Sequence, residues 1–516
     1  MTNSQKIRDN GNVAFEDALN MAGFGWYSYA ITALSGFSTI AFACIVFSTT
    51  FIIPTSACEL GTTSAQQGLL ASIPIIWIIA GNMVCGFLGD KYGRRQMLLY
   101  TLLSAATVNA LASLSPNWVV LIILLSVAAF CAAGIISLAM TFVSECVPAL
   151  KRNVVVLLVT SLFLTSQGVM ALIAIPIIPL SFSIYLPVFG IYWNSWRTLL
   201  LVYSVPSLLA ALGLLFVTES PKYMFARGQE QDAIDIIRTI HRLNHQKSAG
   251  NLNIENLIME TQEFSGPNEK ESTRDRILPL FKMPLLKYTT VMTVLFMCQQ
   301  LGAFTVWLPI IANQFIRVVR TGEGMDKSIC GLISDSRSIP ADPNTVPCSL
   351  NIVSLLFVMV VSLIQSIANA LLSLIVNRLG RRNMAIILTI VCGTCGIVTN
   401  LVPNAYASAA IFIVFMVGIL VFSLHSAIAV VLFPTHLRAF AVAFTMNGSR
   451  MGGIASIQIL KLLLDVNCEA GFYLFNSIFT ASAILLLFLP DDRFLRKPQP
   501  TKQDETEKIL EKTFNS

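Results

Sequence analysis

Arg450 is the residue whose position most needs a chemical explanation, because it lies in a long apolar segment, 12 residues after Arg438. Twelve residues of helix cover about 18 Å, slightly past the middle of a bilayer. A charge at that depth costs at least about 2.5–3.5 kcal/mol and must face a partner or a watery cavity. No Asp or Glu lies at that depth in any predicted helix. Since the planar guanidinium suits carboxylates, Arg450 is predicted either to bind an anionic solute or to bond structurally to carbonyl and amide groups.

Other polar side chains are predicted at the same depth on different helices. They are candidates for lining a solute site, although glutamines also bind helix to helix. The histidine is either a proton-linked switch or a neutral, hydrogen-bonded residue. The tryptophan either stacks on a ring or sugar face or sits near the outer interface. These residues are Gln299 and Gln300 (12 and 13 past Lys287), Gln365 (12 before Asn377), Gln167 (15 past Arg152), His425 (13 before Arg438) and Trp307.

Patterns typical of catalysis or metal binding are missing from the sequence. The histidines (His241, His245, His425 and His436) form no ligand set, and no nucleophile is paired with a base. We therefore expect neither an enzyme nor a metal or other cofactor.

The composition requires lipid around most of the chain, because 55% of its 516 residues are hydrophobic, 12% are charged and the mean hydropathy is +0.71. About 20 apolar residues cross a bilayer as a helix, and a lone strand cannot satisfy its backbone there. A β-barrel is excluded because the apolar runs do not alternate. Twelve runs qualify as helices: 26–53, 66–88, 96–114, 118–143, 154–180, 196–217, 287–311, 352–376, 384–402, 406–432, 439–464 and 470–490.

The distribution of charge predicts how these helices are oriented. The first 25 residues contain charged residues and no apolar core, so the first helix itself directs insertion. Lys and Arg gather in the short loops after helices 2, 4, 8 and 10, whereas the short loops after helices 1, 3 and 9 contain none. Both terminal segments, 1–25 and 491–516, are therefore predicted to be cytoplasmic. The net charge of +6 follows from this bias and gives no reason to expect a nucleic acid partner.

An internal repeat divides the chain into two related halves. Residues 86–95 recur as 373–382, an offset of 287, and the spacing of Glu145, Pro148 and Arg152 recurs in 431–438, an offset of 286. Duplication of a six-helix unit explains both. We predict an all-α polytopic membrane protein with bundles at 26–217 and 287–490. An exofacial loop is expected at 312–351, and a cytoplasmic segment at 218–286 is expected to include an amphipathic helix over 222–247, with Ile234, Ile237, Ile240 and Leu243 on its apolar face.

The repeated motif suits a moving joint between the halves. Its glycines let helices approach closely, and its aspartate can pair with arginines or cap a helix. Charges at such a seam can hold one state and release another. Positive charges that merely set topology explain the arginines but not the glycines or the acid. The predicted gating residues are Gly86, Asp90, Gly93, Arg94, Arg95, Glu145, Arg152, Arg381, Arg382 and Arg438.

These motifs carry a family resemblance. Residues 86–95 resemble the signature loop of the major facilitator superfamily, and residues 144–152 and 218–228 resemble motifs of its sugar-porter and organic-ion branch. Residues 15–25 are similar to the segment before helix 1 in the synaptic vesicle glycoprotein 2 family, and 449–452 resemble helix 11 of organic anion transporters. The resemblance implies a transporter that moves a small solute across the bilayer by alternating access.

Departures from the family pattern bear on the coupling mechanism. Phe42 and Ile45 stand where that branch usually has two acids, and Asn377 and Val431 replace acids in the second half. Without a buried carboxylate, we expect a facilitator or exchanger of an organic anion or polar metabolite rather than a proton symporter. The alternative is a protein of this fold in a vesicle or plasma membrane that no longer transports and acts by binding partners.

Most of the 11 cysteines fall inside predicted helices, where they act as small packing residues. Cys58, Cys330, Cys348 and Cys468 fall on the predicted outer side, where oxidation is possible. Because Cys330 and Cys348 share one loop, we predict a disulfide between them.

Overall fold

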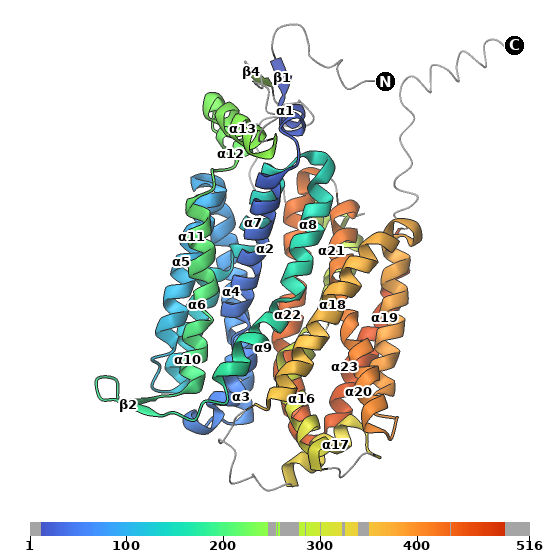
Figure 1. Cartoon of the computed structure of the whole chain (residues 1–516). Coiled ribbons are helices and arrows are strands. Elements are labelled where there is room, and N and C mark those ends of the chain that lie inside the picture. The colour runs from blue at the N-terminus through green and yellow to red at the C-terminus, as the bar shows by residue number, and fades with distance from the viewer. Residues whose placement is uncertain are drawn as a thin grey trace, which may run out of the picture.

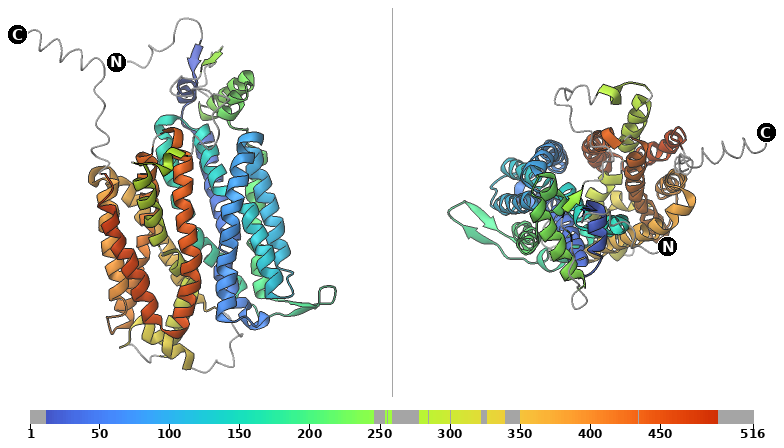
Figure 2. Two further views of the ribbon diagram at one scale, coloured as in Figure 1. Left: turned by 180° about the vertical axis from the view of Figure 1, so that it is seen from behind. Right: turned by 90° about the horizontal axis from the view of Figure 1, so that it is seen from above.

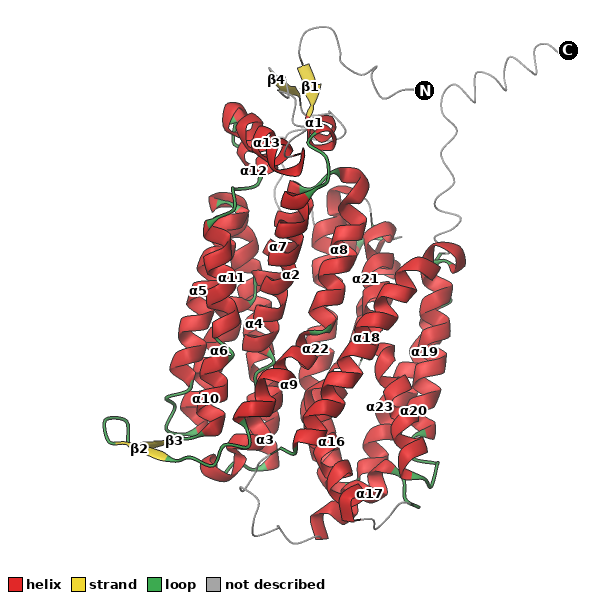
Figure 3. Ribbon diagram, viewed as in Figure 1, coloured by secondary structure: helices red, strands yellow, loops and turns green. Residues whose placement is uncertain are grey.

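The computed structural model of the chain describes residues 12–245, 254, 256–258, 278–283, 285–299, 301–321, 326–338, 350–433 and 435–490. Helices make up almost all of its secondary structure, and most of them run side by side along one direction (Figure 1, Figure 3). We call the two ends of the bundle the α13 end and the α17 end, after α13 (Glu230–His245) and α17 (Ile329–Ser338), which lie at opposite ends in Figure 1. The predicted all-α membrane fold is confirmed.

Ten helical stretches are long and apolar enough to cross a membrane, within the described part of the chain. Two further helices of the predicted twelve, α5 and α22, complete the bundles and are more polar. The first half contains α2 (Trp26–Val46), α3 (Thr49–Leu60), α4 (Ser64–Tyr92), α5 (Arg94–Ala112), α6 (Trp118–Ala132), α7 (Ile135–Cys146), α8 (Ala149–Leu164), α9 (Ser166–Ile177), α10 (Ser195–Val202) and α11 (Val205–Leu215).

The second half contains α15 (Leu285–Cys298), α16 (Leu301–Thr321), α18 (Ile352–Leu379), α19 (Arg381–Val398), α20 (Ala405–Val417), the 3-10 turn η3 (Gly418–Leu420), α21 (Val421–Leu432), α22 (Thr435–Val466) and α23 (Cys468–Leu486). A short 3-10 turn, η2 (Leu278–Phe281), precedes it. Seen from the α13 end, the two halves lie next to each other (Figure 2, right).

The sequence repeat has a structural counterpart in each half. Gly93 and Gly380 both have positive φ, 107° and 82°, where the chain turns between two helices. In each half, the arginine two residues after this glycine binds the end of the last helix of the same half. Arg95 donates to two carbonyls at the end of α11, at 2.8 and 3.2 Å, and Arg382 donates to two at the end of α23, at 3.0 and 2.9 Å. Each arginine thus caps carbonyls that the helix leaves unpaired.

The segment predicted as helix 7 is interrupted. The expected single run, 287–311, consists of α15, which ends at Cys298, and α16, which begins at Leu301 and extends to Thr321. Gln299 lies outside both helices. The expected loop 312–351 therefore holds the end of α16 and the whole of α17. Helix 10 is also interrupted, by η3 between α20 and α21. Such breaks free backbone groups that other side chains must satisfy.

A small subdomain covers the first half at the α13 end. It consists of α1 (Phe15–Met21), α12 (Pro221–Ala226), α13 and two parallel strands, β1 (Asn12–Ala14) and β4 (Asn256–Ile258). The predicted amphipathic helix is confirmed with a break at Gly228, and Ile234, Ile237 and Ile240 are buried. Leu243 is instead 41% exposed, because Asn244 occupies the contact with the bundle there.

The bundle is joined across its halves at the α17 end. One buried apolar cluster includes Phe51 and Met170 of the first half and Phe304 and Trp307 of the second. Two other clusters lie toward the α13 end, and the fully buried residues of each come from one half only. The halves therefore share a common core at the α17 end and have separate cores at the α13 end. A hairpin of β2 (Ile184–Leu186) and β3 (Ile191–Trp193) also lies at the α17 end.

Candidate functional site

Arg450 lies midway along α22, and its side chain reaches α4 in the first half. Its Nη1 atom donates to the carbonyl of Ile78, at 3.4 Å. Because α4 and α22 pack along each other, this hydrogen bond joins the two halves. Arg450 forms no ion pair with a carboxylate among the described residues. The guanidinium is thus half-buried at the interface and held by neutral groups.

Asn82, one helical turn beyond Ile78, faces the same guanidinium. In the amide orientation that satisfies both groups, its oxygen accepts from Nη1 and Nη2 of Arg450, at 2.5 Å each, and its nitrogen donates to the carbonyl of Ala133. The other orientation would set donor against donor, so the oxygen must face Arg450. These are the carbonyl and amide contacts that the structural interpretation of Arg450 predicted.

The packing of α4 on α22 differs on the two sides of Arg450. Toward the α17 end, Gln458 donates to the carbonyl of Ala65 at 3.2 Å, and its side chain lies directly against Gly68. Toward the α13 end, Gly86 follows Asn82 by one turn on the same face of α4. A Cβ added at Gly86 would meet no described atom within 4 Å. Among the described residues, the hydrogen bonds between α4 and α22 therefore lie at Arg450 and toward the α17 end.

A second contact between the halves joins α18 to α8 and α9. Ser366 and Asn369 donate to the backbone oxygen and side-chain oxygen of Ser161, at 3.0 and 3.1 Å. Gly168 lies against the hydroxyl of Ser362, so no larger residue fits there without a shift. Polar side chains and small residues let these helices approach closely, as is typical of helix packing in lipid.

Two of the predicted site glutamines bind the interruption of helix 10. Gln365 donates to the carbonyl of Met416 at 2.9 Å, and Gln299 donates to that of Gly418 at 3.2 Å. Both side chains are buried. The sequence singled them out as candidates, but it did not show that they bind carbonyls beside η3. Gln300 lies outside the described residues.

His425 and Gln167 are buried without complete hydrogen bonding. Neither ring nitrogen of His425 has a partner among the described residues, and its ring packs edge-on to Phe296, with 5.7 Å between centroids. The side-chain oxygen of Gln167 likewise has no partner in the described part of the chain. No hydrogen bond joins either residue to Arg450 among the described residues.

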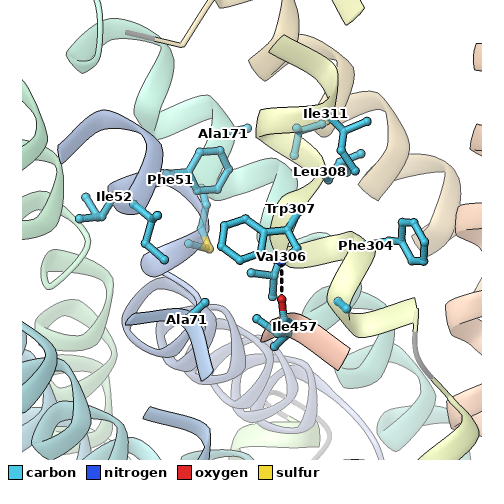
Figure 4. Close-up of a cluster of buried hydrophobic side chains, with 14 of the residues drawn as sticks. Phe51, Ile52, Ala71, Ala171, Phe304, Val306, Trp307, Leu308, Ile311 and Ile457 are labelled. Carbon is cyan, nitrogen blue, oxygen red and sulfur yellow. Dashed lines mark hydrogen bonds between the residues drawn. The ribbon is translucent and has the colours of Figure 1, made fainter. Parts of the chain in front are cut away.

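Trp307 belongs to the apolar cluster that joins the halves. Its indole nitrogen donates to the carbonyl of Ile457 at 3.0 Å (Figure 4). Phe51 and Ile52 of the first half lie beside its ring in Figure 4, and Lys461 lies over the ring at 5.6 Å from the centroid. The indole is fully buried, so it closes the interface between the halves in this state.

Three of the predicted gating charges of the first half, Asp90, Arg94 and Glu145, form one network. Arg94 binds Asp90 at 2.9 Å and Glu145 at 3.4 Å. Ser220 donates to the Glu145 carboxylate at 2.5 Å, which ties the end of α7 to the start of α12. The network thus connects four helix ends, all of them within the first half.

Glu219 is a member of this network that the sequence patterns did not single out as functional. Its carboxylate accepts from the backbone nitrogens of Arg95 and Gln96, at 2.9 and 3.3 Å, at the start of α5. A carboxylate at a helix N-terminus satisfies unpaired N–H groups and the helix dipole. Gly93 leaves room for it, because a Cβ there would stand 2.6 Å from the carboxylate.

The remaining predicted gating residues have varied partners. Arg152 binds Glu16 of α1 at 3.1 Å and the carbonyl of Ser144 at 2.7 Å. Arg381 donates to the carbonyl of Ala427 at 3.0 Å. Arg438 lies in α22, but its side chain is outside the described residues.

Comparison with known families agrees with this geometry. The profile of the Major Facilitator Superfamily matches residues 35–325 and 344–515, most of the chain. The chain belongs to the major facilitator superfamily. It is therefore a multi-pass integral membrane protein of a transporter family, and its two six-helix halves are those of the superfamily fold.

Relatives within the major facilitator superfamily align over nearly the whole chain. The putative transporter SVOPL of Homo sapiens is 23% identical over 502 residues, covering 95% of this chain and 94% of that protein. The synaptic vesicle 2-related protein of Pongo abelii is 22% identical and covers 92% and 80%. The inward open structure of the xylose transporter XylE from E. coli has a TM-score of 0.64 at 13% identity, covering 90% and 97%, and shares the fold.

At its α17 end, this superfamily member contains a buried charge pair that no sequence pattern indicated. Arg197 at the start of α10 is fully buried and binds Glu59 of α3 at 2.7 Å. The same guanidinium donates to the carbonyls of Ser113 and Ser115, both at 2.8 Å. The other oxygen of Glu59 accepts from the indole nitrogen of Trp196 at 2.6 Å. The pair connects three helix ends far apart in the sequence.

The predicted disulfide between Cys330 and Cys348 is wrong, because Cys330 is bonded to Cys468. Helix α17 packs against the start of α23, which brings the two Cα atoms to 5.5 Å although 138 residues separate them. Sharing a loop with Cys348 was a weaker constraint than this packing. Cys58 is also disulfide-bonded.

Peptide mapping is expected to find this connection. Digestion of the unreduced protein should yield one cross-linked species that contains the peptides of Cys330 and Cys468, and reduction should separate them. A species that links the peptides of Cys330 and Cys348 would contradict the pairing. The Cys468→Ser variant is the control, since it should lose the cross-linked species and release a free thiol at Cys330.

Proposed function

We propose that this protein transports small organic anions across its membrane by alternating access. The observation that carries the proposal is Arg450, a cation at the centre of the interface between the halves with no carboxylate partner among the described residues. Its forked guanidinium suits a carboxylate or sulfonate. Among the residues that the structure describes, only neutral groups hold it, so an anion can replace them with a gain in electrostatic energy.

The proposed orientation places the α13 end in the cytoplasm. The Lys and Arg residues of the short loops gather at that end, as the positive-inside rule requires. With this orientation, the common core at the α17 end closes the outer side, and the halves have separate cores on the cytoplasmic side. This arrangement favours an inward-facing state. The resemblance to vesicle proteins supports a plasma or vesicle membrane.

In this proposal the joint at residues 86–95 acts as the cytoplasmic gate. The network of Arg94, Glu145 and Glu219 keeps the helix ends of the first half together as a rigid unit. Gly86 presents a flat face on which the second half can close when the carrier turns outward. The arginines of the second half, Arg381 and Arg382, hold their own helix ends in the equivalent way.

Uptake into proteoliposomes tests the transport activity. We expect the purified protein to take up radiolabelled benzoate or succinate faster than glucose or tetraethylammonium. Preloading the vesicles with the same unlabelled anion should accelerate uptake, as expected of an exchanger, and an imposed pH gradient should change the rate less than twofold. Empty liposomes are the control. A proton current that accompanies uptake would contradict the coupling, and preference for the cation or sugar would contradict the substrate class.

A second candidate function is favoured by one feature of the sequence. Asn377 and Val431 stand where the repeat of the first half has acids, so the second half cannot form the same charge network. A protein of this fold without transport could act by binding partners. Absence of uptake of every solute in the panel by a protein that is correctly folded would favour this alternative.

A further inference from the structure

We propose that Asn82 is an internal competitor of the transported anion for Arg450, and that it sets the affinity and the discrimination between anions and neutral solutes. The inference rests on the proposed function, because it assumes that Arg450 receives the anion. It adds a residue in the opposite half of the protein, on a helix where no sequence motif pointed to a solute contact.

The contacts define what competition means here. The Asn82 oxygen accepts from both terminal nitrogens of Arg450, as one carboxylate oxygen would. The Ile78 carbonyl adds a longer bond, 3.4 Å, to Nη1. Both acceptors belong to α4, and the donor belongs to α22. An anion that binds the Nη1–Nη2 edge of the guanidinium must therefore displace the amide and thereby break a bond between the halves.

A carboxylate should win this competition, whereas a neutral solute should not. The Arg450–Asn82 bond has a charged donor and a neutral acceptor. A carboxylate adds a second, opposite charge, and the Coulomb attraction is strengthened at a partly buried site, so a carboxylate gains more at Arg450 than the amide loses. A neutral hydroxyl or amide offers no such surplus and would only exchange one neutral acceptor for another. Asn82 therefore favours charged solutes, because a neutral solute gains too little at Arg450 to displace the amide. The site thus selects against neutral solutes as well as attracting anions.

The position of the contact links this exchange to the movement of the halves. On one side of Arg450, Gln458 and Gly68 keep α22 tight against α4. On the other side, Gly86 has no described atom within 4 Å of its Cβ position. The Arg450–Asn82 bond therefore lies at the edge of the closed part of the interface. An anion that breaks this bond binds more tightly to the state in which the halves are separated there. It therefore favours that state.

Two substitutions at one position test the proposal by opposite shifts. Asn82→Ala removes the competitor and should lower the KM for benzoate and succinate by about tenfold, since a hydrogen bond to a charged group is of that order. Asn82→Asp supplies a permanent carboxylate to Arg450 and should raise the KM by about 10- to 100-fold. A merely structural role of Asn82 would not produce a tighter KM in one variant and a weaker one in the other.

Further variants keep the outcome decisive. Asn82→Ser also shortens the side chain, with less change in polarity, and should lower the KM as alanine does. It takes the place of Asn82→Ala if the alanine variant fails to fold. Gln458→Ala removes another hydrogen bond between α22 and α4, away from Arg450, and should leave the KM within twofold. If Arg450→Ala abolishes uptake but all Asn82 variants keep the parental KM, the competition is overturned and the anion site survives. If Arg450→Ala leaves uptake unchanged, the proposed function itself fails.

Discussion

Replacing Arg450 by alanine is expected to lower the uptake of benzoate and succinate by about 100-fold, because truncating one partner of a close charge pair costs several kcal/mol. The loss should appear in proteoliposomes as a fall in the uptake rate at low anion concentration. Arg450→Lys keeps the charge but loses the forked geometry and the second donor to Asn82. It should retain a fraction of the activity, intermediate between the parent and alanine.

The matched control for this experiment is Arg238→Ala. Arg238 lies on α13, outside the bundle, and pairs with Asp235 at the surface. The Arg238→Ala substitution removes one positive charge, as Arg450→Ala does, but leaves the interface between the halves unchanged. Uptake should therefore be unchanged. Uptake by Arg450→Ala that equals uptake by Arg238→Ala would refute an anion site at Arg450. Elution of both variants as single species in detergent shows that they are folded.

Replacing Glu59 by alanine is expected to destabilise the protein by about 3–5 kcal/mol, because it leaves a buried guanidinium without its counter-ion. The side chain of Arg197 is 1% exposed, and Glu59 is its carboxylate partner. The loss also removes the acceptor of the Trp196 indole. The midpoint of thermal unfolding in detergent should fall by roughly 3–5 °C.

A surface pair provides the comparison for this prediction. Asp235→Ala breaks the exposed pair with Arg238, whose partners are 61% and 43% exposed. Surface pairs contribute about 0–1 kcal/mol, so its unfolding midpoint should stay within about 2 °C of the parent. Equal shifts for Glu59→Ala and Asp235→Ala would show that burial does not make the Glu59–Arg197 pair important.

The repeat was predictable because it is written into the sequence at a constant offset, and the structure extends it. Asn117 caps the start of α6 by accepting from Val120 at 2.9 Å, and Asn404 caps the start of α20 by accepting from Ala407 at 3.0 Å. These two asparagines are also 287 residues apart. They belong to neither of the two repeated motifs, but the same offset relates them.

The residues of the candidate site could be named from the sequence, but their contacts could not. Counting residues from the helix ends singled out Gln299 and Gln365, and the structure has both of them buried and bound to helix 10. Their partners are carbonyls beside the interruption at Gly418. No proline or charge in that segment marks the break, so the pattern of a continuous apolar helix concealed it.

The sequence by itself determined the twelve apolar helices, their two related halves and the cation in the middle of α22. It could do so because lipid imposes one rule on every spanning segment, namely that the backbone satisfies itself and side chains are apolar. Only the tertiary structure decided that Arg450 faces Asn82, that Arg197 faces Glu59 and that Cys330 is bonded to Cys468. These pairs depend on which helices become neighbours and on the rotation of each about its axis, and neither quantity follows from hydropathy or spacing.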